Sequence, residues 1–500
     1  MSEVKKRLFC KLLAEEDIDL QQIPILPQPR SQSDYPASSA QASVFVFEKL
    51  YPGTAVYNVP SIVRLGERLQ PELLRQALQQ TIDQNEVLRL GFCLRNGTVR
   101  QVVHRSVPAV LGEDRIADAP EAEVMTILQR RIDDFALLPF DLQVPPLLRV
   151  QVIHLDRQEQ YVVFVLHHLV TDALSVRLLV REVGDRYQCL RQGLPFEAQP
   201  QPIQYVDYAL WEQSEAGRSS RLQSLEYWRS VLGNRRPRLP LPTDFPRPAR
   251  RDHRGAVHRL TVDESVVARL RDFARAEGVT MFVVMLACYK ILLAGVAGVN
   301  DVLVAVPMSG RSRAELEKLI GYFGNTVLCL SRLSPTMTVH EAVAAVRDTV
   351  LGAHTHQDAP FEEVVSNWRS GEPLEDGAYD AMFEFLDFRR PSASTEVAQE
   401  SSWPAPVSLD FDVEVHTQTA KCSLFLCCWE SGQALDGVVE YDPDLFAPET
   451  VAAWIEQYIG LLEALPGSRD RVIGELPVAG LDDRRLFEEG FRYPTESSAS

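Results

Sequence analysis

The chain has 500 residues, of which 45% are hydrophobic and 24% are charged. These proportions are ordinary for a folded soluble protein, and they exclude collagen, coiled-coil and disordered classes for most of the chain. Acidic residues outnumber basic residues by 69 to 51, which gives a formal net charge of -18 and argues against a nucleic-acid binder. The length allows two large lobes or about three average domains.

The cysteines indicate a reducing compartment. There are eight of them and none forms a CxxC pair, so their spacing offers neither a zinc framework nor a disulfide pattern. The N-terminal segment carries basic side chains but lacks the apolar core of a signal peptide. We therefore predict a soluble, cytoplasmic protein without a bound metal.

The first regular elements alternate between helix and strand. After Pro71, apolar residues recur at helical spacing over residues 71–92, which predicts a helix with the proline near its start. Residues 147–153 and 161–166 are short apolar runs, which predict two neighbouring buried strands. This order indicates a mixed α/β fold.

A second helix is predicted beyond Thr171. Apolar residues recur at helical spacing from Val176 to Leu190, and either Thr171 or Asp172 is placed to cap the first turn. Further along, residues 235–254 are rich in proline and contain seven arginines. We interpret this segment as a connector, and its basic side chains are one candidate for docking an acidic partner.

One segment, Val279–Val299, is long and apolar enough to suggest a membrane span. Lys290 lies in its middle, no second span exists, and the flanking residues show no basic asymmetry. We therefore predict a helix buried inside the protein, followed by a strand over residues 302–306, and no membrane association.

The most informative motif follows the predicted strand 161–166, which runs directly into HHLVTDA (His167–Ala173). Side chains alternate along a strand, so only one of the two histidines can face a given cavity. A histidine at a strand-to-helix turn can position or receive a proton near neutral pH. Asp172 can cap the following helix or pair with a distant arginine.

From these residues alone, a purely structural role stays open. Adjacent histidines often pack inside a core, and a metal site would need a third ligand that no neighbouring residue supplies at a suitable spacing. His354 and His356 could imitate a metal pair, but a solvated helix face explains them better. The sequence contains no GxSxG, GxxxxGK[ST] or GxGxxG motif, which argues against an α/β-hydrolase, a P-loop enzyme and a Rossmann dehydrogenase.

Together with its surroundings, this motif resembles that of the condensation domains of nonribosomal peptide synthetases, whose usual pattern is HHxxxDG. Further matches follow in chain order along nearly the whole sequence: Ser39–Gln41 with SxAQ, Asn85–Arg89 with HExLR, Leu319–Thr326 with IGxFxNT, and His356–Glu362 with HQxxPFE. So many ordered matches identify the chain as similar to this family over most of its length.

The resemblance implies an α/β fold of two chloramphenicol-acetyltransferase-like lobes in a V-shaped pseudo-dimer, with the active-site tunnel between them. The expected divisions are a lead-in segment over 1–30, an N-terminal lobe with the HHxxxDA motif over 31–185, a C-terminal lobe over 186–485, and a C-terminal linker over 486–500. That linker resembles one leading to an adenylation domain.

The resemblance also implies an acyltransferase that forms amide bonds in nonribosomal peptide or lipopeptide biosynthesis, including antibiotic biosynthesis. An acyl thioester on the phosphopantetheine of one carrier protein would react with the amine of an aminoacyl group on a second carrier. Acyl-CoA is a further possible donor. No cofactor would be bound permanently, and no metal would be required.

Roles for individual residues come from the same resemblance. His168 would be catalytic, either positioning the acceptor amine or taking its proton. His167, Asp172 and Ala173 would belong to the structural part of the motif, with Asp172 paired to Arg311. The residues expected to line the substrate tunnel come from the other matched motifs: Ser39, Gln41, Asn325 and Thr326.

The sequence also departs from the family pattern. Ala173 replaces the usual glycine, residues 42–45 lack the common arginine and tryptophan, and residues 369–380 do not match the RDxSRNPL-like motif. The subtype therefore stays open between peptide extension, N-acylation by a starter domain using acyl-CoA, and ester formation in chain release. The N-terminal methionine favours a first domain, such as a starter. A silent recruitment module, and a hydrolase or epimerase on the same scaffold, also stay open.

Overall fold

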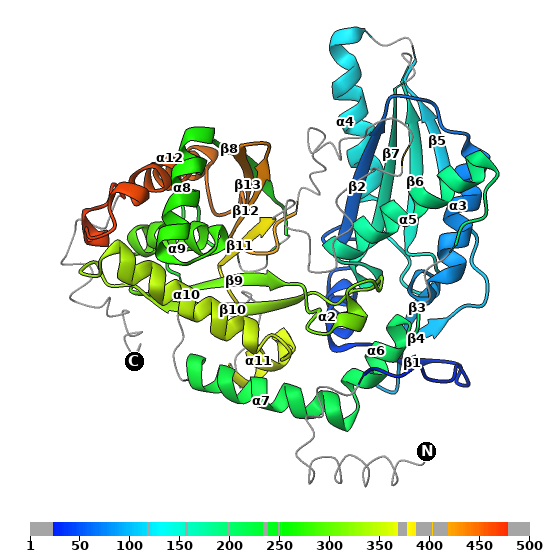
Figure 1. Ribbon diagram of the computed structural model, residues 1–500, viewed down its shortest axis with the longest axis horizontal. Helices are drawn as coiled ribbons and strands as arrows, with labels where there is room; N and C mark the ends of the chain where they lie inside the picture. Colours follow the sequence, from blue (N-terminus) through cyan, green and yellow to red (C-terminus); the bar gives the residue numbers. More distant parts are fainter. Residues whose placement is uncertain are drawn as a thin grey trace, which may run out of the picture.

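The computed structural model describes residues 24–117, 120–155, 159–197, 201–233, 239–248, 251, 253–368, 378–386, 403 and 419–478. Within these residues the chain folds into two α/β lobes that lie side by side, the first drawn in blue to cyan and the second in green to red (Figure 1). This two-lobed α/β arrangement confirms the predicted fold class. The linker expected over 486–500 lies outside the described residues.

The first lobe is built on a four-stranded sheet. Its inner strands are β6 (Leu148–His154) and β7 (Gln160–His167), which pair in antiparallel register and include the two predicted apolar runs. The outer strands are β2 (Asn58–Leu65) and β5 (Leu111–Arg115). Because β7 is buried along its whole length, its sequence can be apolar on both faces.

Helices cover both faces of this sheet. α3 (Pro71–Gln84) and α5 (Ala173–Gln192) share one apolar core with it, and α4 (Glu121–Leu137) forms a separate, smaller core on the opposite face. A small three-stranded sheet completes the lobe. Its strands, in spatial order, are β1 (Tyr35–Pro36), β4 (Thr98–Val103) and β3 (Leu90–Arg95).

The helix predicted over residues 71–92 is shorter in the structure. α3 ends at Gln84, and Asn85 takes an extended backbone conformation while its side-chain amide donates to the carbonyl of Thr81. A short 3-10 helix, η2 (Glu86–Arg89), follows. The asparagine side chain thus caps a carbonyl at the helix end, a local bond that helical periodicity does not reveal.

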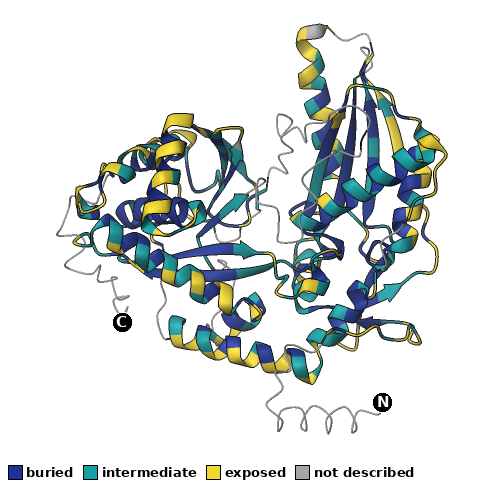
Figure 2. Cartoon of the chain, viewed as in Figure 1, coloured by how far each residue is buried: buried dark blue, intermediate teal, exposed yellow. Residues whose placement is uncertain are grey.

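The second lobe contains a six-stranded sheet. Its strands, in spatial order, are β10 (Asn325–Arg332), β9 (Asp301–Met308), β11 (Ala381–Leu386), β12 (Leu424–Ser431), β13 (Ala434–Tyr441) and β8 (Ala256–Val262). Its larger helices are α8 (Glu264–Glu277), α9 (Met281–Ala297), α10 (Val339–Thr355) and α12 (Pro448–Ala464). Figure 2 shows the inner strands and α9 as mostly buried.

α9 is the buried helix predicted from the apolar segment. Its one charged residue, Lys290, is fully buried, and its ammonium group donates to the carbonyl of Cys329 and the hydroxyl of Ser331, both at 2.7 Å. Among the described helices, no single one is long and apolar enough to cross a membrane. α8 and α9 together have the necessary length and composition, but they are bent by 102° at the break between them.

Two helices, one short and one long, carry the chain between the lobes. α6 (Tyr205–Glu212) packs on the first lobe, and α7 (Glu215–Leu232) continues below both lobes towards α11 (Phe361–Trp368) of the second (Figure 1). The remaining helix of the first lobe, α2 (Ser39–Leu50), lies close to the turn after β7.

The expected boundary between residues 185 and 186 needs correction, because it falls in the middle of α5. Beyond that point, Tyr187, Ile203 and Tyr205 still belong to the core of the first lobe. We propose that the first lobe extends through α6 and ends near Gln213. The boundary predicted from sequence came too early because it followed the end of a motif, not the burial of the side chains.

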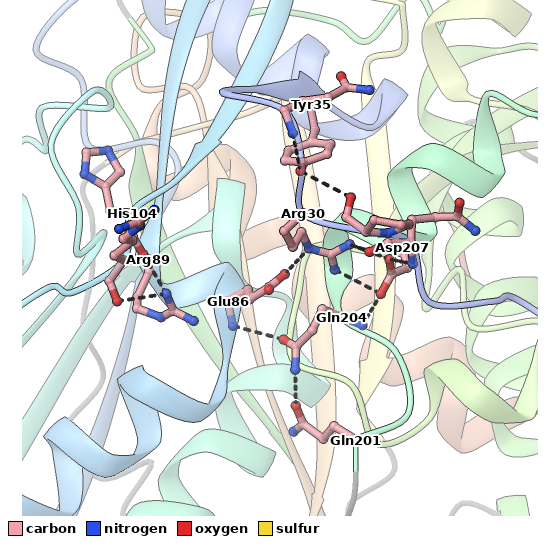
Figure 3. A network of polar contacts seen from close by, with 12 residues as sticks. Arg30, Tyr35, Glu86, Arg89, His104, Gln201, Gln204 and Asp207 are labelled. Atoms are coloured by element: carbon pink, nitrogen blue, oxygen red, sulfur yellow. Dashed lines mark hydrogen bonds and ion pairs between the residues drawn. The ribbon is translucent and has the colours of Figure 1, made fainter.

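A polar network fixes the segment before the first lobe (Figure 3). Arg30 donates to Glu86 at 2.8 Å and to Asp207 at 2.7 Å, and the backbone N–H of Gln28 also donates to Asp207. Gln204 joins the same network through the N–H of Glu86. The end of the lead-in segment predicted over 1–30 is therefore attached to η2 and α6 of the first lobe.

Candidate active site

A cavity of about 1080 Å³ is lined by residues of both lobes. The first lobe supplies part of β2, His168 directly after β7, and the start of α5 with Ala173. The second lobe supplies parts of β10, β11 and β12, together with Lys421. A cavity of this size, with mixed apolar and polar walls, is suited to an organic substrate.

His168 lies where β7 ends and the short helix η3 (His168–Val170) begins. Its backbone N–H donates to the carbonyl of Tyr57 at 2.8 Å, and its Nδ1 lies 3.1 Å from the carbonyl oxygen of Thr171. A carbonyl can only accept, so Nδ1 carries the hydrogen and Nε2 keeps a free lone pair. The aromatic rings of Tyr57 and Tyr322 flank the imidazole, with centroids at 6.0 Å and 5.3 Å.

The protonation state of His168 follows from its surroundings. The pKa of His168 is lowered to about 3, mainly by burial and in part by the positive charge of Lys421, while the bond to Thr171 acts in the opposite direction. The imidazole is therefore neutral at physiological pH. It can accept a hydrogen bond through Nε2 without first losing a proton.

His167 faces the opposite way and does not line the cavity. Its side chain is 2% exposed, its Nδ1 accepts the N–H of Leu169 at 3.2 Å, and its Nε2 lies 3.4 Å from a carboxylate oxygen of Glu48. Burial is the main cause that lowers the pKa of His167. The two neighbouring histidines thus point to opposite sides, as expected from the alternation of side chains along a strand. The ring of His168 faces the cavity, and the ring of His167 packs in the interior.

Asp172 is the N-cap of α5, where its carboxylate accepts the N–H of Ser175 at 2.8 Å. The same carboxylate lies 3.1 Å and 3.2 Å from Nη2 of Arg311, on the loop after β9, and accepts the N–H of Phe323. Arg311 also donates to the carbonyl of Leu319 at 2.7 Å. This buried ion pair joins the helix after the motif to a loop of the second lobe.

Two of the four residues expected to line the tunnel do line the cavity, Asn325 and Thr326. The side-chain amide of Asn325 is hydrogen-bonded within the protein. Its Nδ2 donates to the carbonyls of Gln357 and Ala359 at 2.7 Å, and its Oδ1 accepts the N–H of Phe361. Asn325 therefore holds the loop before α11 against β10, which shapes the cavity wall.

The other two, Ser39 and Gln41, do not line the cavity, and this expectation was wrong. Gln41 is fully buried: it completes a capping box with Ser38 and donates to the carbonyl of Leu169 at 2.8 Å. The helical period of α2 instead turns Ala40 and Ser43 towards the cavity. The glutamine thus anchors α2 to the turn that carries His168.

Several cavity residues were missed by the sequence reasoning. Tyr57 and Tyr322 flank His168, and Tyr379 and Lys421 lie on the walls of the same cavity. Tyr322 stands in a matched segment, yet nothing in its local pattern gave it a role. They come from four separate parts of the chain, so neither periodicity nor spacing could bring them together.

The structure offers no candidate metal ligands within the described residues, where no group of three or more His, Cys, Asp or Glu side chains could hold an ion. His356 of the HTHQD segment stacks on Tyr227 with ring centroids 4.1 Å apart. His354 is exposed on the last turn of α10.

The expected docking role of the arginine-rich connector is weakened by its described part. Arg247 lies 3.4 Å from Asp380, and Arg254 lies 2.7 Å from Asp444. Arg251 forms a buried pair with Asp442 at 3.0 Å. These arginines pair with carboxylates of the same chain, while the other four lie outside the described residues.

Known proteins resemble this chain over most of its length. A family model of the condensation domain matches residues 31–476. One protein of the linear gramicidin synthase of Brevibacillus parabrevis is 31% identical over 473 residues, which cover 94% of this chain and 6% of that protein. Another protein of the same synthase is 33% identical over 476 residues, 95% of this chain and 9% of that protein. The chain therefore spans less than a tenth of these relatives.

Solved structures share the fold. The X-domain from teicoplanin biosynthesis superimposes with a TM-score of 0.79 at 22% identity, covering 91% of this chain and 100% of that one. The starter condensation domain of rhizomide synthetase, solved with C8-CoA, gives a TM-score of 0.74 at 18% identity, covering 89% and 97% of the two chains. With the family model matching from residue 31 to residue 476, the chain belongs to the condensation domain family of nonribosomal peptide synthetases.

Proposed function

We propose that this chain joins an acyl thioester to the amine of a carrier-bound aminoacyl group, forming an amide during nonribosomal peptide or lipopeptide synthesis. The observation that carries the proposal is the placement of His168. Its ring lines a cavity shared by both lobes, and its bond to Thr171 leaves Nε2 free to accept a hydrogen bond. The family membership supports the same reaction.

The chemistry requires few groups from the protein. The amine nitrogen attacks the thioester carbonyl carbon, and the carbonyl π electrons move to oxygen. The C–S bond then breaks as the C=O bond re-forms, and the sulfur leaves as a thiolate that takes up the proton released by nitrogen. A thioester is already activated and a neutral amine is a competent nucleophile. Holding the amine and the thioester in the geometry of attack can therefore supply much of the rate acceleration.

For His168 we propose a positioning role in the ground state. A ring whose pKa is lowered to about 3 has little affinity for a proton, so it is a weak base. Its neutral Nε2 is nevertheless a good hydrogen-bond acceptor for an amine N–H. We infer that it orients the nitrogen lone pair towards the carbonyl carbon, with proton transfer following only after the C–N bond forms.

Asp172 and Arg311 support the position of His168 indirectly. Their ion pair fixes the first turn of α5 against the loop after β9, and Gln41 ties α2 to the carbonyl of Leu169. Neither Asp172 nor Arg311 accepts or donates a bond to His168 among the contacts of the described residues. We assign both residues a structural role.

We propose that the partners are acyl or peptidyl carrier proteins that present substrates on phosphopantetheine, and an adenylation domain of the same synthetase. Acyl-CoA is a second possible donor, as for a starter domain, and no permanently bound cofactor is proposed. Ala173 at the start of α5 lines the cavity, so its methyl group narrows the site where the family pattern has glycine. A cytoplasmic location is part of the same proposal.

A reconstituted reaction tests the proposal. The purified chain is mixed with an aminoacyl carrier and a panel of acyl donors on carrier protein or CoA, and the amide is measured by mass spectrometry. We expect His168→Ala to lower the single-turnover rate by about a hundredfold or more. His354→Ala is the matched control, because His354 is an exposed histidine outside the cavity.

Equal product from wild type and His168→Ala, with unchanged circular dichroism, would overturn the proposal. The donor panel also separates subtypes, because turnover with acyl-CoA alone indicates a starter. Since the pKa of His168 is lowered, protonation of this ring should not reduce the rate between about pH 8 and pH 6. A loss of rate in that range that disappears in His168→Gln would contradict the neutral assignment.

A further inference from the structure

Lys421 is a basic side chain near His168 on the second-lobe wall of the cavity. It stands just before β12, it is exposed, and it lines the cavity. Its ammonium nitrogen lies 5.8 Å from the centre of the Tyr57 ring. The same ring packs edge-on against the imidazole of His168, and the carbonyl of Tyr57 accepts the His168 N–H. Tyr57 therefore contacts both the ammonium group and the imidazole.

The hydrogen-bonding capacity of the Lys421 ammonium group is unused in the described part of the chain. No hydrogen bond or ion pair there involves Lys421, and its ammonium group lies instead over the face of Tyr57. Its charge also acts on Glu384, in β11. Burial raises the pKa of Glu384, and the charge of Lys421 partly opposes this. A charged donor with spare bonding capacity thus stands in the wall of the reaction cavity.

We propose that Lys421 stabilises the negative charge that develops on the thioester oxygen during acyl transfer. The inference rests on the proposed function, because it concerns the same cavity and the same reaction. It adds a second electrostatic group to the site. His168 holds the nitrogen nucleophile, and Lys421 acts on the oxygen that receives the electron pair.

Opposite charges appear on two atoms during the attack. When nitrogen attacks, it gains positive charge and the carbonyl oxygen gains negative charge. A neutral His168 can accept a hydrogen bond from the nitrogen, but it has no proton on Nε2 to offer the oxygen. A positive charge on the cavity wall stabilises the developing oxyanion by direct Coulomb attraction.

The same charge also acts on His168. An ammonium nearby disfavours a second positive charge, so Lys421 helps to keep the imidazole neutral and able to accept the amine N–H. The charged and titratable groups around the two residues come from several elements: His167, Tyr57, Tyr322, Tyr379, Asp172 with Arg311, Glu362, Glu384 and Glu440.

A purely structural role makes a different prediction. Lys421 could serve only to balance the carboxylate of Glu384. In that case Glu384→Gln would remove the need for the lysine, and the double variant Glu384→Gln with Lys421→Met would regain wild-type rate. If Lys421 acts on the reacting oxygen, the double variant stays as slow as Lys421→Met.

The first experiment is kinetic. We expect Lys421→Met to lower the single-turnover rate of amide formation by about a hundredfold, the loss typical of removing one oxyanion-stabilising group. Lys421→Arg, which keeps the charge, should recover most of the rate. Lys49→Met is the matched control, since Lys49 also lies over an aromatic ring, Phe45 at 5.2 Å, but does not line the cavity. A wild-type rate in Lys421→Met overturns the proposal.

The second experiment needs no turnover. Ring nitrogen shifts of His168 are followed by NMR as pH falls, with His168→Gln identifying the signal among the ten histidines. Lys421→Met should begin to protonate His168 at a higher pH than wild type, and Lys421→Arg should not. An identical onset in all three proteins overturns the coupling. A further outcome separates the two proposals. If none of the proteins forms amide but Lys421→Met still raises the pH at which His168 begins to protonate, the proposed function is wrong while the electrostatic effect of Lys421 on His168 is confirmed.

Discussion

His168 gains its properties from three features of its surroundings. Thr171 fixes the tautomer through a carbonyl at 3.1 Å, Tyr57 holds the backbone N–H, and burial keeps the ring neutral. None of these contacts changes the residue itself, yet together they convert a common histidine into a fixed hydrogen-bond acceptor. The neighbouring His167 has the same chemistry and serves packing, because its ring points into the interior beside Glu48.

The ion pair between Asp172 and Arg311 supports a prediction about stability. The two side chains are 11% and 3% exposed, so Arg311→Ala would leave a buried carboxylate without its cation. We expect the free energy of unfolding to fall by about 3 kcal/mol or more, as measured by urea denaturation. The loss should be accompanied by little change in the neutral state of His168.

An exposed pair provides the comparison for that measurement. Arg275 and Asp272 lie 2.8 Å apart on α8, but their side chains are 77% and 75% exposed. Arg275→Ala should leave the free energy of unfolding essentially unchanged, because water screens the pair. If Arg311→Ala behaves like Arg275→Ala, the pair with Asp172 does not carry the structural role assigned to it.

At the scale of elements, short connections place the residues around the cavity. The loop after β9 must turn sharply to bring Arg311 to Asp172 at the start of α5. Gly310 makes this turn with a φ of +62°. A Cβ atom at Gly310 would overlap the carbonyl oxygen of Phe323. The position therefore requires glycine for two reasons, backbone conformation and close approach.

We predict that Gly310→Ala destabilises the protein by about 3 kcal/mol or more and slows condensation, because Arg311 is displaced from Asp172. The matched variant is Gly432→Ala, in the turn between β12 and β13. Gly432 has a similar φ of +60°, but a Cβ there would meet nothing within 4 Å. That variant should cost only about 1 kcal/mol. Equal thermal denaturation midpoints for the two variants would show that the close approach to Phe323 does not matter.

On the scale of the whole molecule, the two lobes are not independent in sequence. Trp403 follows β11 of the second lobe, yet it packs in the core of the first, where its Nε1 donates to the carbonyl of Val180 at 3.2 Å. Residues 316–323, between β9 and β10, also contribute apolar side chains to that core. The second half of the chain therefore completes the core of the first lobe.

Trp403 supports a prediction about this coupling. Its side chain is 6% exposed and its ring stacks with Tyr187 and lies against Gly184. We expect Trp403→Ala to lower the free energy of unfolding by about 4 kcal/mol, because a large buried ring is lost from the first core. Trp403→Phe keeps an aromatic ring and should recover much of the loss. Unfolding curves identical to wild type for Trp403→Ala would show that this contact does not couple the lobes.

The sequence by itself determined the local features. Helical spacing and a capping residue at Thr171 or Asp172 predicted α5, the apolar runs predicted β6 and β7, and strand alternation predicted that the two histidines face different ways. The ordered motifs identified the family and therefore the fold. These inferences succeed because each depends on neighbours a few residues apart, where backbone geometry fixes the direction of side chains.

Only the tertiary structure decided which side chains share the cavity. Motif membership suggested Ser39 and Gln41, but α2 turns them away, and it gave no role to Tyr57 or Lys421. Even the expected pair of Asp172 and Arg311 joins residues 139 positions apart. Contacts over such separations are set by how helices and sheets pack, and that packing depends on the burial of the whole chain, not on any local period.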